Sequence, residues 1–335
     1  MRCGHREVAY NSCRNRHCPK CQSASAAEWL AARERDLLPV AYYHVVFTLP
    51  RALHAFFRAD PRRGYGLLFR AVSATLLEVA RERLGAEIGV TAVLHTWTQK
   101  LEFHPHIHCV ATGGGLTPED RWHACPPGFF LPERVLAAVF RGKLIGSLKR
   151  AIRRDEITLS STRKAALRLL REATRTEWVV DARRPFAGPE QVLKYLSRYT
   201  HRIALTNARL VAQDDETVTF RWKDRREGDA KKLMTLPAEE FLRRFFQHVL
   251  PSGFVRIRHY GLHANAGKAE KIARCRELLG APPPVPPPLE EEGWEDRLLR
   301  LTGRDVRRCP GCGERTLTLV ETLAPTVMES RGPAP

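Results

Sequence analysis

The chain has 335 residues, of which 43% are hydrophobic, and its 55 Lys and Arg against 37 Asp and Glu give a formal net charge of +18. It is long enough to bury a sizeable core, and it has no apolar run close to the roughly 20 residues that cross a bilayer or to a signal peptide, so a cytoplasmic protein is expected. Such a basic chain attracts polyanions, which makes nucleic acid the expected partner and a solvated basic surface the alternative; charge alone also leaves ribosomal-type or membrane-surface binding open.

The first 25 residues predict a small zinc-binding module. Cys18 and Cys21 have the spacing of a zinc knuckle, in which two thiolates of one tight turn reach the same ion. In a reducing compartment clustered cysteines favour metal binding over disulfides. A closed site needs two more ligands, for which Cys3 and Cys13 are the candidates. His5 and His17 are held in reserve, and unliganded surface cysteines are the alternative.

Three elements are predicted before residue 85. Helix-forming residues fill 25–38, and aromatic and β-branched residues fill 42–49, where Pro50 ends a strand. An apolar stripe with helical spacing predicts a long helix over 66–84.

Two further strands surround the first candidate site: one over 89–98 and, after a short connection over 100–104, a histidine strand that ends at the glycines 113–115. Side chains alternate along a strand, so His106 and His108 share one face while the residue between them faces a core. Two neighbouring imidazoles can ligate one divalent metal, although a strand can also carry histidines by chance. If the strands form an antiparallel hairpin, Gln99 lies near His106 across the ladder and is either a third, oxygen ligand or an ordinary polar residue.

The second half of the chain predicts helices and hairpins in uneven alternation. They are helix 136–152 with a basic outer face, helix 161–174, strand 178–180, helix 188–202, a hairpin of 209–212 and 217–222, strand 233–236, helix 238–248 and strand 254–259. This order predicts an α+β fold with a mainly antiparallel central sheet flanked by helices.

The last segment begins with a proline-rich stretch, 281–288, which predicts a stiff exposed linker. Cys309 and Cys312 follow in a tail, where a lone pair does not close a zinc site and would need partners elsewhere. We therefore expect a zinc module in 1–25, the main domain in 26–280, and a linker with a tail in 281–335.

Tyr195 and Tyr199 form the second candidate site. Four residues apart on a predicted helix, they lie on one face about one turn from each other. Core packing is the common reason for such a pair, but the neighbouring cations Lys194, Arg198 and Arg202 favour phenols presented to an anion. With a metal to withdraw charge, a phenol can attack a phosphodiester and leave a 5′-phosphotyrosine and a free 3′-hydroxyl, a step that can run backwards onto another strand.

These motifs resemble those of the HUH endonucleases of the two-tyrosine class and, more closely, of the rolling-circle transposases of the insertion-sequence-91 (IS91) type. The matching stretches are 10–21, 44–50, 95–97 with Gln99, 104–108, 195–202 and 258–261. The resemblance covers about residues 3 to 280 and the tail cysteine pair. Such transposases usually have a further Cys-x-x-Cys at the start, of which Cys3 is the matching part here.

The resemblance implies an HUH, ferredoxin-like endonuclease core that nicks and joins single-stranded DNA with Mg²⁺ or Mn²⁺. It also implies that the zinc module helps to recognise the element ends, and that the protein associates with the bacterial nucleoid when it acts. Tyr195 and Tyr199 would be the nucleophiles, and His106 and His108 the ligands of the catalytic metal.

Two other functions remain open. Residues 104–110 also look like the histidine-triad nucleotide hydrolases, in which the central histidine attacks a phosphate without metal, so chelation separates the two mechanisms. The third hypothesis is a non-catalytic, zinc-containing DNA-binding protein, such as a decayed transposase, which would bind DNA without forming a covalent adduct.

Overall fold

The computed structural model describes residues 3–8, 23–128, 130–183, 191, 204–224, 227–282 and 293–323. The chain divides into a larger unit, Cys13–Pro286, and a smaller one made of Met1–Ser12 and Pro287–Pro335. Among the described residues, no helix is both long enough and apolar enough to cross a membrane.

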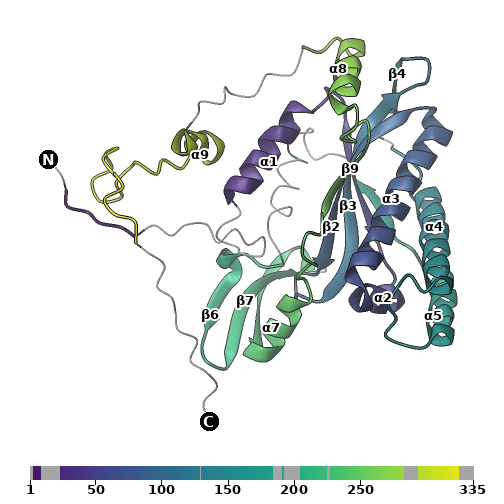
Figure 1. Ribbon diagram of the computed structural model, residues 1–335, viewed down its shortest axis with the longest axis horizontal. Coiled ribbons are helices and arrows are strands. Elements are labelled where there is room, and N and C mark those ends of the chain that lie inside the picture. Colours follow the sequence, from purple (N-terminus) through teal and green to yellow (C-terminus); the bar gives the residue numbers. More distant parts are fainter. Residues whose placement is uncertain are drawn as a thin grey trace. The chain divides into compact units, whose positions relative to one another are not determined.

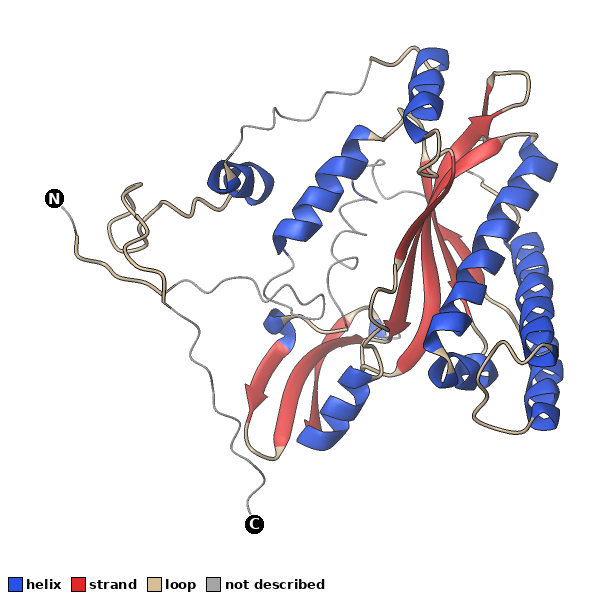
Figure 2. Ribbon diagram, in the orientation of Figure 1, coloured by secondary structure: helices blue, strands red, loops and turns tan. Residues whose placement is uncertain are grey.

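The larger unit is built on an antiparallel sheet with the strand order β5-β1-β3-β2-β9, and β4 pairs with the end of β3 (Figures 1 and 2). Its strands are β1 (Tyr42–Thr48), β2 (Glu87–Trp97), β3 (Phe103–Leu116), β4 (Trp122–Ala124), β5 (Val180–Arg183) and β9 (Ile257–Gly261). The prediction of an α+β fold on a mainly antiparallel sheet is confirmed.

Helices cover one face of this sheet, where Phe47, Leu94 and Ile107 are buried in the main core. They are α2 (His54–Ala59), α3 (Pro61–Leu84), α4 (Glu133–Arg153) and α5 (Arg163–Arg175). The long helix α3 begins where the Asp60 carboxylate accepts a hydrogen bond from the backbone N–H of Arg63, and it ends at a left-handed glycine, as helices commonly do.

The opposite face packs against α1 (Ser23–Arg35), which lies on the other side of the sheet in Figure 2. Trp29 of α1 packs on Tyr42, Val93 and Val110. Helix α8 (Lys268–Leu278) follows β9 and adds Ile272 to a neighbouring small cluster.

A second, three-stranded sheet of β6 (Leu210–Gln213), β7 (Thr217–Asp224) and β8 (Ala230–Pro237) carries helix α7 (Ala238–Phe246). The predicted hairpin is confirmed by the antiparallel pairing of β6 with β7. Asp214 fixes its turn by accepting backbone hydrogen bonds from Glu216 and Thr217. In the smaller unit α9 spans Trp294–Thr302.

Several elements differ from the sequence prediction. The last strand of the main sheet runs over Ile257–Gly261 rather than 254–259, because residues 251–254 form a turn in which the backbone N–H of Phe254 bonds to the carbonyl of Pro251. Helices α2, α8 and α9 and strand β4 were not predicted, since such short elements have little periodicity of their own.

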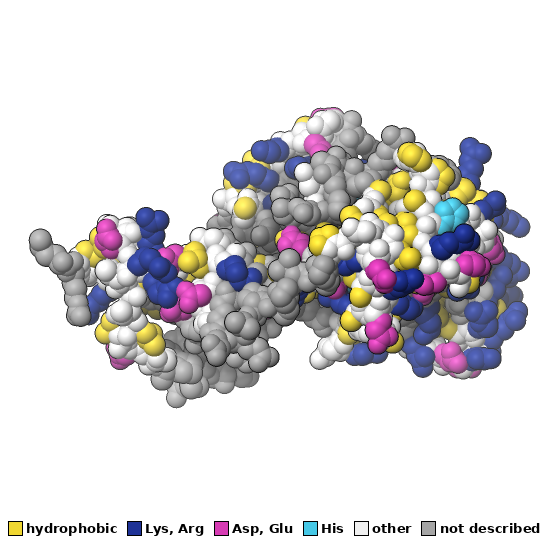
Figure 3. Space-filling model, turned by 90° about the horizontal axis from the view of Figure 1, so that it is seen from above, with side chains coloured by type: hydrophobic (Ala, Val, Ile, Leu, Met, Phe, Trp, Pro, Cys, Tyr) yellow, Lys and Arg dark blue, Asp and Glu magenta, His cyan; other side chains and the backbone are white. Residues whose placement is uncertain are grey.

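The basic outer face predicted for the helix around 136–152 is confirmed. Lys and Arg side chains gather at the side of the larger unit where α4 and α5 lie (Figure 3). Exposed members include Arg134, Arg141, Arg150, Arg153, Arg163, Lys164, Arg168, Arg171 and Arg175. This surface lies behind the sheet face that carries Ile107, and so on the far side of the sheet from the histidines of β3.

Gly261 ends β9 at a point where no side chain fits. Its φ is +60°, and a Cβ there would lie 1.9 Å from the carbonyl oxygen of Ile88 on the adjacent strand. We expect Gly261→Ala to lower the free energy of unfolding by more than about 3 kcal/mol, since it combines backbone strain with a steric clash.

Gly85→Ala is the matched control for urea unfolding. Gly85 has nearly the same φ, +62°, but nothing lies within 4 Å of the added Cβ. Only the left-handed conformation is then penalised, at about 1–2 kcal/mol. Equal losses in the two variants would show that the contact with Ile88 is not what demands glycine at residue 261.

Candidate metal centre and the cleft beside it

Three histidines meet on neighbouring strands of the main sheet. His106 and His108 share one face of β3, as predicted, and the register of β2 and β3 places His95 directly opposite His106. One ring nitrogen from each of the three lies within 4.8 Å of the others. His95 and His108 are buried and His106 is half-buried, so the sheet holds the cluster on a rigid base.

A polar contact at Nδ1 orients the ring of each of the two cluster histidines on β3, His106 and His108. Nδ1 of His106 donates to the backbone carbonyl of His104 at 2.6 Å, and Nδ1 of His108 lies 2.8 Å from Nε2 of His44 on β1. A carbonyl oxygen only accepts, so the proton of His106 is on Nδ1. This arrangement directs Nε2 of each ring toward a shared ligand, which is how second partners orient metal-binding histidines.

Burial keeps His95 and His44, the partner of His108, in the neutral form. Burial, followed by the nearby His106 and Arg256, lowers the pKa of His95 well below its usual value. Burial and then Arg183 lower the pKa of His44 to about 4. Both rings are therefore neutral at pH 7, and neutral imidazole is the ligand form.

The spacing fits a metal ion after small side-chain rotations. Two ligands on opposite sides of an ion lie about 4.2 Å apart, which is twice a typical metal–nitrogen distance of about 2.1 Å. Among the described residues the cluster contains three imidazoles and no carboxylate. Such a donor set suits transition ions such as Mn²⁺ better than Mg²⁺, which prefers oxygen ligands.

The predicted position of Gln99 across the ladder from His106 is wrong. β2 ends at Trp97, which pairs with Phe103, so Gln99 lies in the turn between the strands and His95 takes the place opposite His106. The Gln99 carbonyl accepts from Nη2 of Arg209 at 2.5 Å. A ligand role for the Gln99 side chain stays a prediction.

Hydrogen bonds hold this turn between the two histidine strands in a fixed shape. The hydroxyl of Thr98 accepts from the backbone N–H groups of Lys100 and Glu102, both at 3.2 Å. Leu101 between them has a φ of +60°, and its side chain is buried. The left-handed backbone at Leu101 is strained, and it places the Leu101 side chain in the core of the second sheet.

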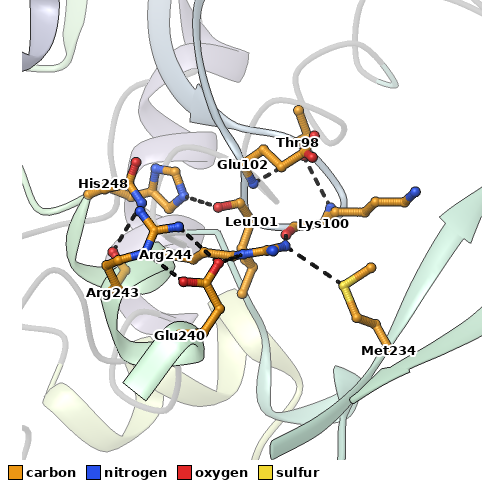
Figure 4. A network of polar contacts seen from close by, with 10 residues as sticks. Thr98, Lys100, Leu101, Glu102, Met234, Glu240, Arg243, Arg244 and His248 are labelled. Atoms are coloured by element: carbon orange, nitrogen blue, oxygen red, sulfur yellow. Dashed lines mark hydrogen bonds and ion pairs between the residues drawn. The ribbon is translucent and has the colours of Figure 1, made fainter. Parts of the chain in front are cut away.

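Helix α7 and His248, two residues beyond its end, hold the same turn from outside (Figure 4). Nη1 of Arg244 donates to the carbonyl of Lys100 at 3.1 Å, while its Nε donates to Glu240 at 2.6 Å. Nε2 of His248 donates to the carbonyl of Leu101 at 3.1 Å. The second sheet and its helix thereby fix the hairpin that presents His95 and His106.

An open cleft of about 620 Å³ lies beside the histidines. Its lining includes Arg51, Arg58, Arg243 and Arg244 against the carboxylate of Glu102. It also includes His104, whose ring centroid is 5.2 Å from that of His106. Four guanidinium groups around an open cleft are suited to binding phosphate groups.

The other predicted site residues fall mostly outside the described residues. These are the nucleophiles Tyr195 and Tyr199, the cations Lys194, Arg198 and Arg202, and the zinc ligands Cys13, Cys18 and Cys21. Cys3 is described, and it lies beside Cys309 and Cys312. His95 and the cleft arginines are the described site residues that were not predicted; His95 lies in a predicted strand and in the matching stretch 95–97, but neither signal gave it a ligand role.

A second pair of histidines, the half-buried His259 and the buried His263, lies where α1, β2 and β9 meet around a cavity of about 20 Å³. The hydroxyl of Thr91 is 3.0 Å from Nδ1 of His259 and 3.3 Å from Nδ1 of His263, and Nη1 of Arg33 is 3.1 Å from Nε2 of His259. Burial is the main cause that lowers the pKa of His259 to about 4 and that of His263 to about 3.

We expect this group to make the protein acid-sensitive. Between pH 6.5 and 4 these two histidines bind protons in the unfolded chain but stay neutral in the folded protein, so the free energy of unfolding falls as the pH drops through this window. The slope is at most about 1.4 kcal/mol per pH unit for each histidine. Above pH 7 they are neutral in both states and contribute no slope.

Urea unfolding at several pH values measures this effect. A His263→Gln variant should show a shallower decline below pH 6.5, whereas His123→Gln, at an exposed position of β4, should keep the wild-type slope. The same slope in all three proteins would contradict the assignment to His263.

Comparisons with known proteins match most of the chain. A family model described as "Putative transposase" matches residues 89–271, and one described as a transposase zinc-binding domain of the IS91 type matches residues 1–49. The "Putative transposase y4qJ" of Sinorhizobium fredii is 49% identical over 329 residues, which cover 95% of this chain and 83% of that protein. The transposase for insertion sequence element IS801 of Pseudomonas savastanoi pv. phaseolicola is 27% identical over 315 residues, covering 93% and 76%.

Among solved structures, two complexes of the conjugative relaxase TrwC with oriT DNA match at TM-scores of 0.26 and 0.28 and at 13% and 14% sequence identity. The first match covers 47% of this chain and 68% of the relaxase, and the second covers 48% and 71%. A likeness at that level adds nothing to the fold described above.

Proposed function

Because the chain belongs to the IS91 family of transposases, we propose that it mobilises an insertion sequence by nicking and joining single-stranded DNA in a rolling-circle-like reaction. The observation that carries this proposal is the histidine cluster of His95, His106 and His108 beside the arginine-lined cleft. A metal-ligand set next to a phosphate-binding surface is what metal-assisted cleavage of a DNA strand requires.

A divalent ion at the cluster would withdraw charge from the scissile phosphate and from the departing 3′-oxygen. Mn²⁺ fits three imidazoles better than Mg²⁺ does. Tyr195 or Tyr199 would supply the nucleophile: the phenolic oxygen forms a bond to phosphorus, its proton passes to solvent, and the bond from phosphorus to the 3′-oxygen breaks. The 5′-phosphotyrosine keeps the energy of the phosphodiester, so a 3′-hydroxyl of another strand can displace the tyrosine and complete the joining step.

The cleft would hold the strand that enters the site. Arg51, Arg58 and Arg243 are exposed on its wall, and Arg58 lies with its guanidinium carbon 4.8 Å from the ring centroid of Phe103. Lys194, Arg198 and Arg202 would add phosphate contacts beside the tyrosines, and the N-terminal zinc module would help to recognise the element ends. The protein would act on DNA in the bacterial cytoplasm.

Arg51→Gln with Arg58→Gln should weaken binding of a single-stranded oligonucleotide about tenfold or more at low salt. Each phosphate contact contributes about 0.7 to the slope of log affinity against log salt for single strands, so losing two should reduce the slope by about 1.4. Fluorescence anisotropy at several salt concentrations measures both quantities. Arg171→Gln with Arg175→Gln changes the charge equally on α5, at residues that do not line the cleft, and should leave the slope unchanged; equal effects would argue for binding by net charge alone.

The decisive experiment uses an oligonucleotide labelled on the 3′ side of its cleavage site and looks for a protein–DNA complex that survives SDS. The complex should form with Mn²⁺, disappear with EDTA and carry the label through a 5′-phosphate. Cleavage that persists in EDTA would favour a histidine-triad mechanism. DNA binding without any covalent complex would favour a decayed, non-catalytic transposase.

A further inference from the structure

We propose that Cys3, Cys309 and Cys312 hold one zinc ion that joins the N-terminal segment to the tail of the smaller unit. The Sγ atoms of Cys3 and Cys309 are 3.5 Å apart, and all three Sγ atoms lie within 4.8 Å of one another. In a tetrahedral zinc site with Zn–S distances of about 2.3 Å, neighbouring sulfurs lie about 3.8 Å apart. The three thiols already have nearly that spacing.

The tail cysteines sit in a tight turn that prepares them as ligands. The backbone N–H of Gly313 donates to the carbonyl of Cys309 at 2.8 Å, and that of Cys309 donates to the carbonyl of Glu314 at 2.7 Å. Gly313 has a φ of +75°, which glycine adopts readily. Cys309 is only 2% exposed although it lies in a short tail segment, so the turn places its thiol inward toward Cys3.

Backbone N–H groups also point at two of the sulfurs. The N–H of Glu314 approaches Cys312, and the N–H of His5 approaches Cys3, each two residues beyond the thiol. The contact from His5 favours the thiolate of Cys3, but the neighbouring Cys309 and Cys312 thiols raise the pKa of Cys3 overall, whereas the contact from Glu314 lowers the pKa of Cys312. Three thiolates this close repel one another, and a bound cation removes that repulsion, so the arrangement suits a metal better than it suits free thiols.

A disulfide would not account for the cluster, because it pairs two cysteines and leaves the third thiol beside it. His5 is a candidate for the fourth ligand, since its Nδ1 lies 3.4 Å from the position of a Cβ on Gly311, within the Cys-x-x-Cys turn. The zinc-binding family model ends at residue 49 and the transposase model at residue 271, so neither assigns a role to Cys309 or Cys312. This inference does not rest on the proposed nuclease activity.

Thiol alkylation of the full-length protein tests the site. With bound zinc, iodoacetamide should label Cys3, Cys309 and Cys312 slowly, and removal of the metal with a strong chelator should make all three reactive, as read by peptide mass spectrometry. In a Cys3→Ser variant, Cys309 and Cys312 should become reactive even with zinc present. In a Cys312→Ser variant, Cys3 should become reactive, which tests the same link from the other end of the chain.

Zinc content provides the second measurement. Cys309→Ser with Cys312→Ser should lose one zinc per chain, while Cys125→Ser, at a half-buried thiol of the larger unit, should keep the wild-type content and protection. The proposal is overturned if Cys309 and Cys312 react equally fast with zinc and after chelation. It is also overturned if the double variant binds as much zinc as the wild type.

Discussion

Replacing His106 and His108 together with alanine should abolish metal-stimulated cleavage of single-stranded DNA. Their ring nitrogens and that of His95 make up the cluster on β2 and β3, and the double change leaves a single imidazole there. A metal that stabilises the charge of a phosphoryl-transfer transition state contributes several kcal/mol, and each 1.4 kcal/mol is a factor of ten in rate. We therefore expect a loss of at least about 10³ in the single-turnover cleavage rate.

Two further variants separate metal binding from folding. His123→Ala removes an exposed imidazole from β4 and should leave the rate unchanged. His44→Ala removes the partner of His108 Nδ1, and loss of such a partner usually weakens metal binding 10–100-fold. This variant should need more Mn²⁺ for half-maximal cleavage yet approach the wild-type rate at saturation. Full cleavage by the His106/His108 double variant would remove both residues from the metal site.

Replacing Tyr195 and Tyr199 together with phenylalanine should eliminate the covalent protein–DNA complex. Phenylalanine has no oxygen with which to attack phosphorus, so the loss should be complete rather than partial. Each single variant should keep one of the two linkages and fail to complete strand transfer, since donor and target strands each need a tyrosine. SDS gels of labelled substrates measure the adduct, and product sequencing measures the transfer.

Binding of single-stranded DNA by the double tyrosine variant should stay close to wild type, because the charges of the cleft are intact. Tyr260→Phe is the matched control: Tyr260 lies on β9 and packs against the main core, so its phenol faces away from the histidines. Adduct formation that survives the loss of both Tyr195 and Tyr199 would show that the nucleophile lies elsewhere.

Local patterns were enough to predict parts of the fold and of the site. The alternation of side chains along a strand put His106 and His108 on one face, and helical spacing gave α4 a buried side with Leu144 and Leu148 beneath an outer face with Arg141. Such inferences need only the geometry of one element, which its own sequence specifies.

The parts that were missed depend on how elements pair. His95 meets His106 only because the hairpin turns at residues 98–102, and a change in the length of that turn would bring another residue opposite. The cleft collects Arg51 and Arg58 from one region and Arg243 and Arg244 from another, almost two hundred residues later. No local pattern in the sequence predicts that these four arginines line one cleft.

The contact between Cys3 and Cys309 spans 306 positions of the chain. During synthesis the first of these thiols leaves the ribosome long before its partners, so for most of translation the nascent chain has only part of the zinc-binding set. With the zinc site proposed above, a chain that ends before residue 312 would contain every residue of the larger unit but would lack part of the ligand set that Cys3 needs.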